Sequence, residues 1–321
     1  MNFLPILLFS AGVVACVYSN AIPAGYDAEN LCPPPENIAP CTCYKSPFTY
    51  RVTARCSNFT NSYEIKAIFD RNPDWKLQEV WIDGSVMPFL PAKMLEEAHF
   101  QFLNVSSTSL VTLFDKTPVT TPELSLYMYD VKILRGFQWS DIANSTLLEM
   151  RTRNMTIRSL GKDFKDNIPK GVQRLYFENT GITSIKNQAF SHLQKLKVLE
   201  IRRGSLKKLS RDWFPRPWNV TYLDFSYQKI AALPEDILAD LPMLSVFFFE
   251  GNLLSTISEK VFSDVMVFYI LKGNPINCNC NIKWIIGKFL PLFLQGECAE
   301  PESLKGTELK YLTKDNFRHC N

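Results

Sequence analysis

Apolar residues recur in a fixed pattern along most of this chain of 321 residues. An anchor position returns every 22 to 25 residues, at Val80, Leu103, Leu126, Met150, Leu175, Leu199, Leu223, Phe247 and Tyr269. A second apolar residue follows each anchor by seven positions, at Met87, Leu110, Ile133, Ile157, Ile182, Leu206, Ile230, Leu254 and Ile276. A unit of this length cannot bury its own apolar face, so the pattern predicts that successive units stack into a solenoid.

Each unit also predicts a short strand around its anchor. Residues 172–177 and 196–201 alternate apolar and other side chains, which places one face inward and the other outward. The whole frame matches the leucine-rich repeat, L-x-x-L-x-L-x-x-N-x-L. We therefore predict an α/β solenoid, a curved horseshoe with a parallel sheet on its concave side and turns or short helices on its convex side.

The turn position that normally carries Asn is poorly kept in this chain. It reads, from the first repeat to the last, Ser85, Thr108, Val131, Met155, Thr180, Gly204, Gln228, Asn252 and Asn274. That Asn usually satisfies backbone groups in the turn after the strand. Its replacement predicts irregular turns and a less regular curvature.

Nine cysteines divide the chain further. Cys16 lies in an apolar N-terminal segment, and the other eight form one cluster near each end: Cys32, Cys41, Cys43, Cys56 and Cys278, Cys280, Cys298, Cys320. An even count in a secreted chain predicts disulfides, and spacing alone allows three connectivities per cluster. Four cysteines with a Cys-x-Cys pair could instead hold zinc, which is the less favoured interpretation beside a repeat array.

The segment from Asn274 to Trp284, NPINCNCNIKW, resembles the C-terminal cysteine cap of extracellular leucine-rich-repeat proteins. The resemblance implies Cys278–Cys298 and Cys280–Cys320 bonds, and the cluster from Cys32 to Cys56 is similar to the matching N-terminal cap, which implies Cys32–Cys43 and Cys41–Cys56. Within that family the chain is most like secreted arthropod proteins that resemble the non-catalytic subunit of Oplophorus luciferase. That likeness implies a companion subunit for this chain, and it does not imply that this chain oxidises luciferin.

The domain organisation follows from these segments. Residues 1–21 read as a signal peptide, 22–60 as the N-terminal cysteine cap, 61–273 as leucine-rich repeats and 274–321 as the C-terminal cysteine cap. No other segment has the roughly 18 apolar residues that a transmembrane helix needs. We expect a secreted, extracellular glycoprotein with N-linked sites at Asn58, Asn104, Asn144, Asn154 and Asn219.

The chemistry visible in the sequence favours binding over catalysis. The formal net charge of +3 gives no reason to expect nucleic acid or an anionic membrane as a partner, and no catalytic, metal or cofactor motif stands in a supporting context. We therefore expect no enzyme activity, cofactor or metal. The outward strand positions carry Tyr, Arg and acidic residues, the first two of which dominate many interfaces.

Those outward positions define a predicted partner-binding face over the third to eighth repeats, made by Tyr127, Tyr129, Arg151, Arg153, Tyr176, Glu178, Glu200, Arg202, Tyr222, Asp224, Tyr227 and Phe248. The alternative is a solvated face whose charges pair across neighbouring strands. A glycan on Asn104, which falls on the same face, would cover the second repeat. The partner would be an extracellular protein of unknown identity, and the alternatives are a regulatory or stabilising subunit of an extracellular enzyme or an innate-immune binder of microbial ligands.

Overall fold

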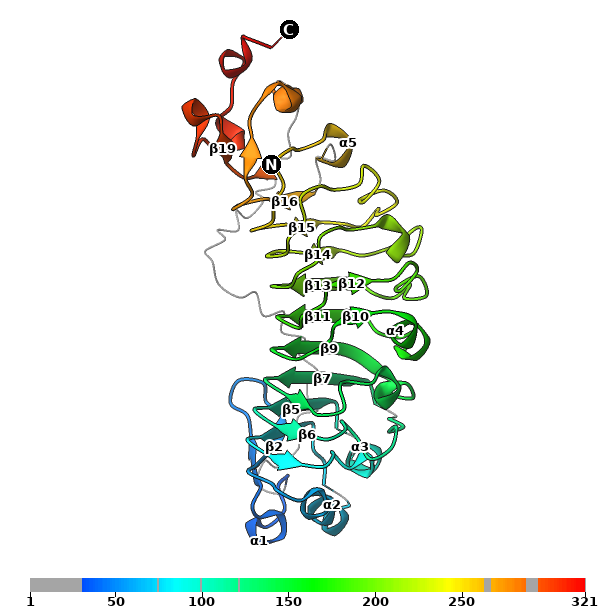
Figure 1. Ribbon diagram of the computed structural model, residues 1–321. Coiled ribbons are helices and arrows are strands. Elements are labelled where there is room, and N and C mark those ends of the chain that lie inside the picture. Colours follow the sequence, from blue (N-terminus) through cyan, green and yellow to red (C-terminus); the bar gives the residue numbers. More distant parts are fainter. Residues whose placement is uncertain are drawn as a thin grey trace, which may run out of the picture.

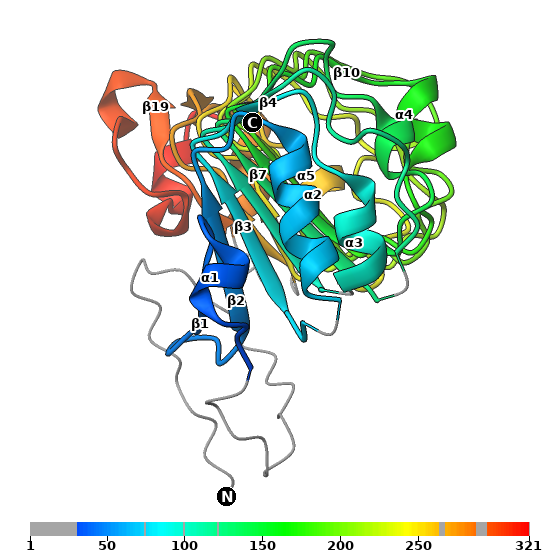
Figure 2. The same ribbon diagram turned by 90° about the horizontal axis from the view of Figure 1, so that it is seen from below.

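The computed structural model describes residues 31–73, 75–98, 100–120, 122–262, 267–286 and 294–320. The predicted signal peptide, residues 1–21, lies outside them. The described chain forms an elongated solenoid with a large sheet along one side and short helices along the other (Figure 1). Viewed from below, helices α2 (Ser62–Arg71) and α3 (Ala92–Ala98) lie beside the sheet, with α4 (Lys162–Asn167) and α5 (Glu259–Phe262) further along the stack (Figure 2).

The main sheet has 12 strands, each contributed by a successive stretch of the chain. In spatial order they are β1 (Thr42–Lys45), β2 (Val52–Ser57), β3 (Glu79–Asp83), β5 (Phe102–Ser106), β7 (Leu124–Tyr129), β9 (Leu147–Arg153), β11 (Arg174–Glu178), β13 (Val198–Arg202), β14 (Tyr222–Asp224), β15 (Val246–Phe248), β16 (Phe268–Ile270) and β18 (Leu294–Gln295). Only β1 and β2 pair antiparallel among them. The predicted α/β solenoid with a parallel sheet is confirmed.

The register of the sheet puts the predicted anchors opposite one another. All nine pair in sequence order from Val80 to Tyr269, and Val80 also pairs with Ala54 of β2. The N-terminal cap therefore adds a strand of its own to the repeat sheet. Most anchors are completely buried, so the column they form is the floor of a continuous core.

A second buried column is aromatic and lies behind the sheet. Trp139 packs edge-on against Phe164, Phe164 against Phe190, and Phe214 stacks between Phe190 and Trp218, with centroid distances of 4.6 to 5.4 Å. Trp213, Phe214 and Trp218 of the DWFPRPW segment are all buried. This segment replaces the usual convex turn of its repeat because its rings fill the same space.

The turn after each strand is more regular than the sequence predicts. The residue four positions after every anchor has a positive φ, between 46° and 70°, at Gly84, Ser107, Asp130, Asn154, Asn179, Arg203, Tyr227, Gly251 and Gly273. Its backbone N–H donates to the neighbouring repeat in all but the last, as in Asn179 N to the carbonyl of Arg202 at 3.0 Å. The expectation of irregular turns is therefore wrong, because this left-handed residue fixes the bend without the missing asparagines.

Substitute side chains also take over the hydrogen bonds of the turn asparagine. Asn252 and Asn274 each make the usual pair of hydrogen bonds with the preceding repeat. Each donates to a backbone carbonyl there, that of Phe225 or Phe249, and accepts from a backbone N–H, that of Ile230 or Leu254. Gln228 makes the equivalent pair, donating to the carbonyl of Ile201 and accepting from Leu206 N at 3.0 Å. The longer side chain of Gln228 has room because Gly204 carries no Cβ. A Cβ at that position would lie 2.6 Å from the Gln228 amide oxygen.

Two smaller sheets follow the turns. The strands β4 (Val86–Met87), β6 (Ser109–Leu110) and β8 (Lys132–Ile133) form one, and β10 (Ser159–Leu160) and β12 (Ser184–Ile185) form the other. The first three begin six residues after their anchors and the last two begin nine residues after theirs. Between the third and fourth repeats the strand therefore shifts along the chain, and the two sheets remain separate.

Disulfides close both ends of the solenoid. Cys32 bonds to Cys43 and Cys41 to Cys56 beside α1 (Pro35–Ile38), while Cys278 bonds to Cys298 and Cys280 to Cys320. These are the pairings that the family resemblance implies. His319 lies close to Cys280 and Cys320, but a disulfide leaves no thiolate there for zinc.

The C-terminal cap combines a small sheet with short 3₁₀ helices. The sheet pairs β17 (Ile276–Asn277) with β19 (Cys298–Glu300), and the 3₁₀ segments among the described residues are η2 (Trp139–Ile142), η3 (Arg211–Trp213), η4 (Cys280–Ile285), η5 (Glu302–Leu304), η6 (Leu309–Tyr311) and η7 (Lys314–Phe317). Trp284 donates from its indole nitrogen to the carbonyl of Ile257 at 3.0 Å, which ties the cap to the preceding repeat. Among the described residues, none of the helices has the length and apolar character to cross a bilayer.

Candidate partner-binding face

The outward positions of the main sheet align into two columns of side chains. Tyr127, Arg151, Tyr176, Glu200, Asp224 and Phe248 face one another across adjacent strands, as do Tyr129, Arg153, Glu178 and Arg202. Tyr222 belongs to a third column, and Tyr227 lies in the turn after β14 with a positive φ. The predicted residues therefore share one sheet face and its rim.

The first half of this face is a Tyr–Arg cluster, consisting of Tyr127, Tyr129, Arg151, Arg153 and Tyr176. The Arg151 guanidinium lies 4.0 Å from the ring centre of Tyr176 and 5.6 Å from that of Tyr127, and Arg153 lies 5.0 Å from Tyr129. Such cation–π contacts hold flexible cations in place before any partner arrives. Burial raises the pKa of Tyr127 to about 12, and the Glu149 carboxylate adds to the shift, so these tyrosines are neutral hydroxyl donors.

Glu149 organises this cluster, although the sequence analysis did not select it. Its side chain is buried, and its carboxylate pairs with Arg151 on its own strand and with Arg174 on the next. Glu149 lies one position before its anchor, outside the two outward columns that the repeat pattern predicts. The recurring signal is a charged residue at this position in adjacent repeats, Glu149 and then Arg174.

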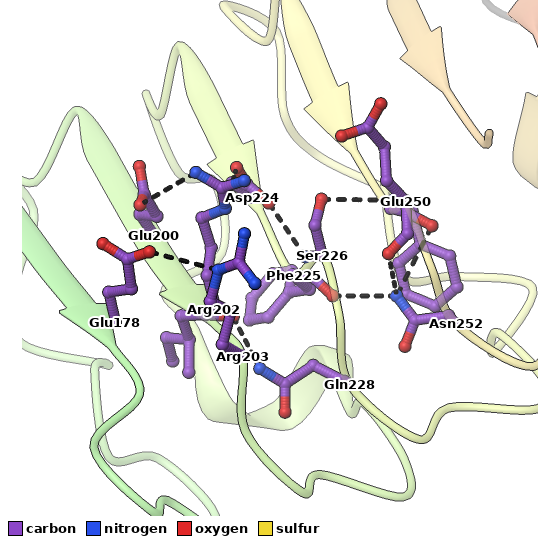
Figure 3. Close-up of polar contacts among 12 residues, drawn as sticks. Glu178, Glu200, Arg202, Arg203, Asp224, Phe225, Ser226, Gln228, Glu250 and Asn252 are labelled. Atoms are coloured by element: carbon purple, nitrogen blue, oxygen red, sulfur yellow. Dashed lines mark hydrogen bonds and ion pairs between the residues drawn. The ribbon is translucent and has the colours of Figure 1, made fainter. Parts of the chain in front are cut away.

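The second half is an acidic cluster, in which Glu178, Glu200 and Asp224 surround Arg202 and Arg203, and Glu250 lies on the next repeat beyond Ser226 (Figure 3). Arg202 lies 3.3 Å from Asp224 and 3.7 Å from Glu200, and Arg203 lies 3.2 Å from Glu178. Burial, together with the nearby Asp224 carboxylate, raises the pKa of Glu200 to about 7. Three carboxylates pair with the two guanidinium groups, and Glu250 adds a fourth carboxylate nearby, which leaves the cluster with excess negative charge at neutral pH.

Asp224 is a correction to the predicted partner-binding set. Only 2% of it is exposed, and its carboxylate accepts from the backbone N–H of Ser226 at 2.8 Å while it pairs with Arg202. It therefore cannot contact a partner directly. Its side chain positions Arg202 and the turn, whereas the other eleven predicted residues are half-buried or exposed.

Asn104 is a second correction. Its side chain is 2% exposed, and its amide nitrogen donates to Glu79 at 2.9 Å, so a glycan on it would require breaking a buried hydrogen bond. The amide is turned into the face because Glu79 offers a buried acceptor one repeat earlier. The remaining sequon asparagines, Asn58, Asn144, Asn154 and Asn219, are exposed. The predicted shielding of the second repeat by a glycan is withdrawn.

Comparisons with known proteins agree with this architecture. A family model described as leucine rich repeat matches residues 170–230, which include β11, β13 and β14. The chain folds as a leucine-rich-repeat solenoid. Outside the matched residues the same 12-stranded sheet and anchor register continue in both directions, so the repeat extends well beyond the segment that the family model detects.

The chain is similar to proteins of different lengths. It is 24% identical over 340 aligned residues to the Oplophorus-luciferin 2-monooxygenase non-catalytic subunit of Oplophorus gracilirostris, covering 92% of each chain. It is 22% identical to Toll-like receptor 9 of Mus musculus over 218 residues, which are 65% of this chain but only 20% of the receptor. A match to the high affinity nerve growth factor receptor of Gallus gallus, at 31% identity, covers 32% of this chain and 13% of that receptor.

Proposed function

We propose that this chain is an extracellular, non-catalytic protein-binding module whose partner docks on the concave sheet from β7 to β15. The observation that carries the proposal is the Tyr–Arg cluster, where three tyrosines and two arginines are fixed by Glu149 and by one another. Fixed aromatic and guanidinium groups lose little freedom on binding, and such residues supply most of the energy of many interfaces.

The acidic cluster beside it gives the face a polarity that selects among partners. A partner surface would present apolar or carbonyl groups to the Tyr–Arg cluster and basic groups to Glu178, Glu200 and Glu250. Charge complementarity of this kind sets orientation and the rate of association. Extracellular location is supported by the four disulfides, which persist in oxidising compartments.

A more specific candidate is a non-catalytic subunit of an extracellular enzyme complex. It is favoured by the alignment to the Oplophorus subunit, because that alignment covers nearly the whole of both chains. The Toll-like receptor match covers a fifth of that receptor, so it lends support to the repeat and to no particular ligand. Co-purification of one stoichiometric second polypeptide with enzyme activity would support the subunit role.

The test is affinity purification of the tagged chain from its native fluid, with the partner identified by mass spectrometry. The variant Arg153→Glu/Tyr176→Ala removes an exposed cation and the ring under Arg151, and we expect it to lose the partner while its melting temperature stays within a few degrees. The matched control is Lys310→Glu/Tyr311→Ala, an exposed Lys–Tyr pair in the C-terminal cap. Loss of the partner in the control, or its retention in the first variant, would contradict docking on the concave face.

A further inference from the structure

A groove of about 840 Å³ lies where the two small sheets separate, between β8 and β10. We call it the lateral groove and define it by Lys132, Leu134, Arg135, Phe137, Arg158 and Lys162 on its walls. Its volume falls within the range of about 300–1,000 Å³ that is typical of ligand sites. It is formed by residues of the turns and convex segments, so it is separate from the concave face proposed above.

The shift in the small strands creates this groove. Because β8 begins six residues after its anchor and β10 begins nine residues after its own, the two strands do not pair, although β8 pairs with β6 and β10 with β12. Each is therefore the end strand of its sheet, on facing sides of the groove. End strands of this kind are templates for an added strand.

The walls of the groove are basic. Lys132, Arg135 and Arg158 are exposed, and no ion pair to any of them is present in the described part of the chain. Lys162 pairs with Asp166, and Asp163 is engaged by the N–H of Trp139 and the amide of Asn167. Three cations are thus free to meet negative charge on a ligand.

The groove also offers apolar contact. Leu134 is 60% exposed, and Phe137 is half-buried with its ring edge-on to Trp139 at 4.9 Å. An extended chain presents alternate side chains to opposite directions, so one set can contact Leu134 and Phe137 while the other meets the cations. A compact anion such as phosphate would use the cations and leave the apolar wall and the strand edges without a role.

We propose that the lateral groove binds an extended acidic peptide segment of a partner protein, which adds a strand between β8 and β10. The lining residues run from Val131 to Phe137 on one side and from Asn154 to Ser159 on the other, so the segment is about six residues long. Main-chain hydrogen bonds to the strand edges supply affinity, and the arginines and the apolar wall supply specificity for alternating acidic and apolar residues.

The test measures fluorescence polarisation of a labelled Glu-Val-Glu-Leu-Glu-Val peptide with the full chain. We expect saturable binding that weakens about tenfold or more in Arg135→Glu/Arg158→Glu and weakens with added salt. The matched control, Lys207→Glu/Lys208→Glu, makes the same charge change at exposed lysines two repeats away and should bind as the native chain does. Absence of binding to the native chain, or equal loss in the control, would overturn the proposal.

Two further probes distinguish strand addition from simple charge attraction. The same peptide methylated at alternate backbone nitrogens keeps its charges but loses half of its main-chain donors, so we expect it not to bind. Equal binding of the methylated peptide, or its displacement by inorganic phosphate at the concentration that displaces the acidic peptide, would overturn the peptide site. If Arg135→Glu/Arg158→Glu proves unfolded by circular dichroism, Arg135→Ser/Arg158→Ser replaces it with the same expected loss.

Discussion

At the scale of single residues, the concave face is built by groups that the partner would never touch. Glu149 and Asp224 are buried carboxylates that form ion pairs with arginines. Glu149 pairs with Arg151 and Arg174, and Asp224 pairs with Arg202, all on strands of the main sheet. Glu200 differs from these two in its charge state. It lies 3.7 Å from Arg202, but burial and the Asp224 carboxylate on the neighbouring strand disfavour its charged form. Its raised pKa means that the folded chain binds a proton there more readily than the unfolded chain does.

This linkage predicts a pH-dependent effect of Glu200→Gln. Since burial lifts the pKa of Glu200 from 4.5 to about 7, the charged form costs folding free energy that is absent below pH 4.5 and complete above pH 7. The variant should match the native chain near pH 4.5 and exceed its stability by on the order of 2 kcal/mol at pH 8. Urea unfolding from pH 5 to 8 measures the difference. An offset that does not change with pH, or the same trend in the exposed control Glu302→Gln, would contradict it.

At the scale of the element, the repeat keeps its shape through the backbone of the turn and not through one side chain that recurs in every repeat. A left-handed residue lies four positions after every anchor, from Gly84 to Gly273. Several of these positions carry Asn, Asp or Gly, which tolerate that conformation. Gln228 beside Gly204 shows how a lost asparagine is replaced by a longer amide and a smaller neighbour.

We therefore predict that Gln228→Ala destabilises the chain by about 2–4 kcal/mol, because it leaves the buried N–H of Leu206 and the carbonyl of Ile201 without partners. Gln228→Asn should recover little of the loss, since the shorter side chain does not span both groups. Denaturant unfolding gives the values, with the exposed Gln295→Ala as the matched control. A loss below 0.5 kcal/mol for Gln228→Ala would show that the turn is held by its backbone alone.

How far the sequence predicts this molecule also depends on the element considered. The anchors and the outward columns follow from a repeat period that is visible in the sequence itself, because stacked strands must keep their register. The burial of Asp224 and Asn104 does not follow, since it depends on which neighbouring strand offers Arg202 or Glu79. The lateral groove is equally hidden, because it arises from a three-residue shift of a two-residue strand.

At the scale of the whole molecule, the caps protect the two ends of a core that runs the length of the chain. The C-terminal cap is held by two disulfides, by the Trp284 indole on Ile257 and by Lys283, which donates to the carbonyl of Cys320 at 2.7 Å. Since each repeat contacts only its neighbours, damage to one end should stay near that end.

Removal of one cap disulfide tests this locality. Cys280→Ala/Cys320→Ala opens a loop of 40 residues, and we expect a loss of about 2–4 kcal/mol in the stability of the cap. Hydrogen exchange should then accelerate in β15 and β16 while β5 and β7 keep their native protection. Uniform acceleration along the sheet would instead show that the solenoid unfolds as a single cooperative unit.

The shifted small strand between the third and fourth repeats has a consequence for cooperativity along the solenoid. Stability in such arrays is a sum of unit terms and nearest-neighbour coupling terms, and the junction between β8 and β10 lacks one of the two strand pairings that its neighbours possess. An unfolding front that enters from the N-terminal cap would lose one of its two strand ladders on reaching this junction. The first three repeats would then behave as one thermodynamic block, bounded at the lateral groove and joined to the rest of the chain by the main sheet.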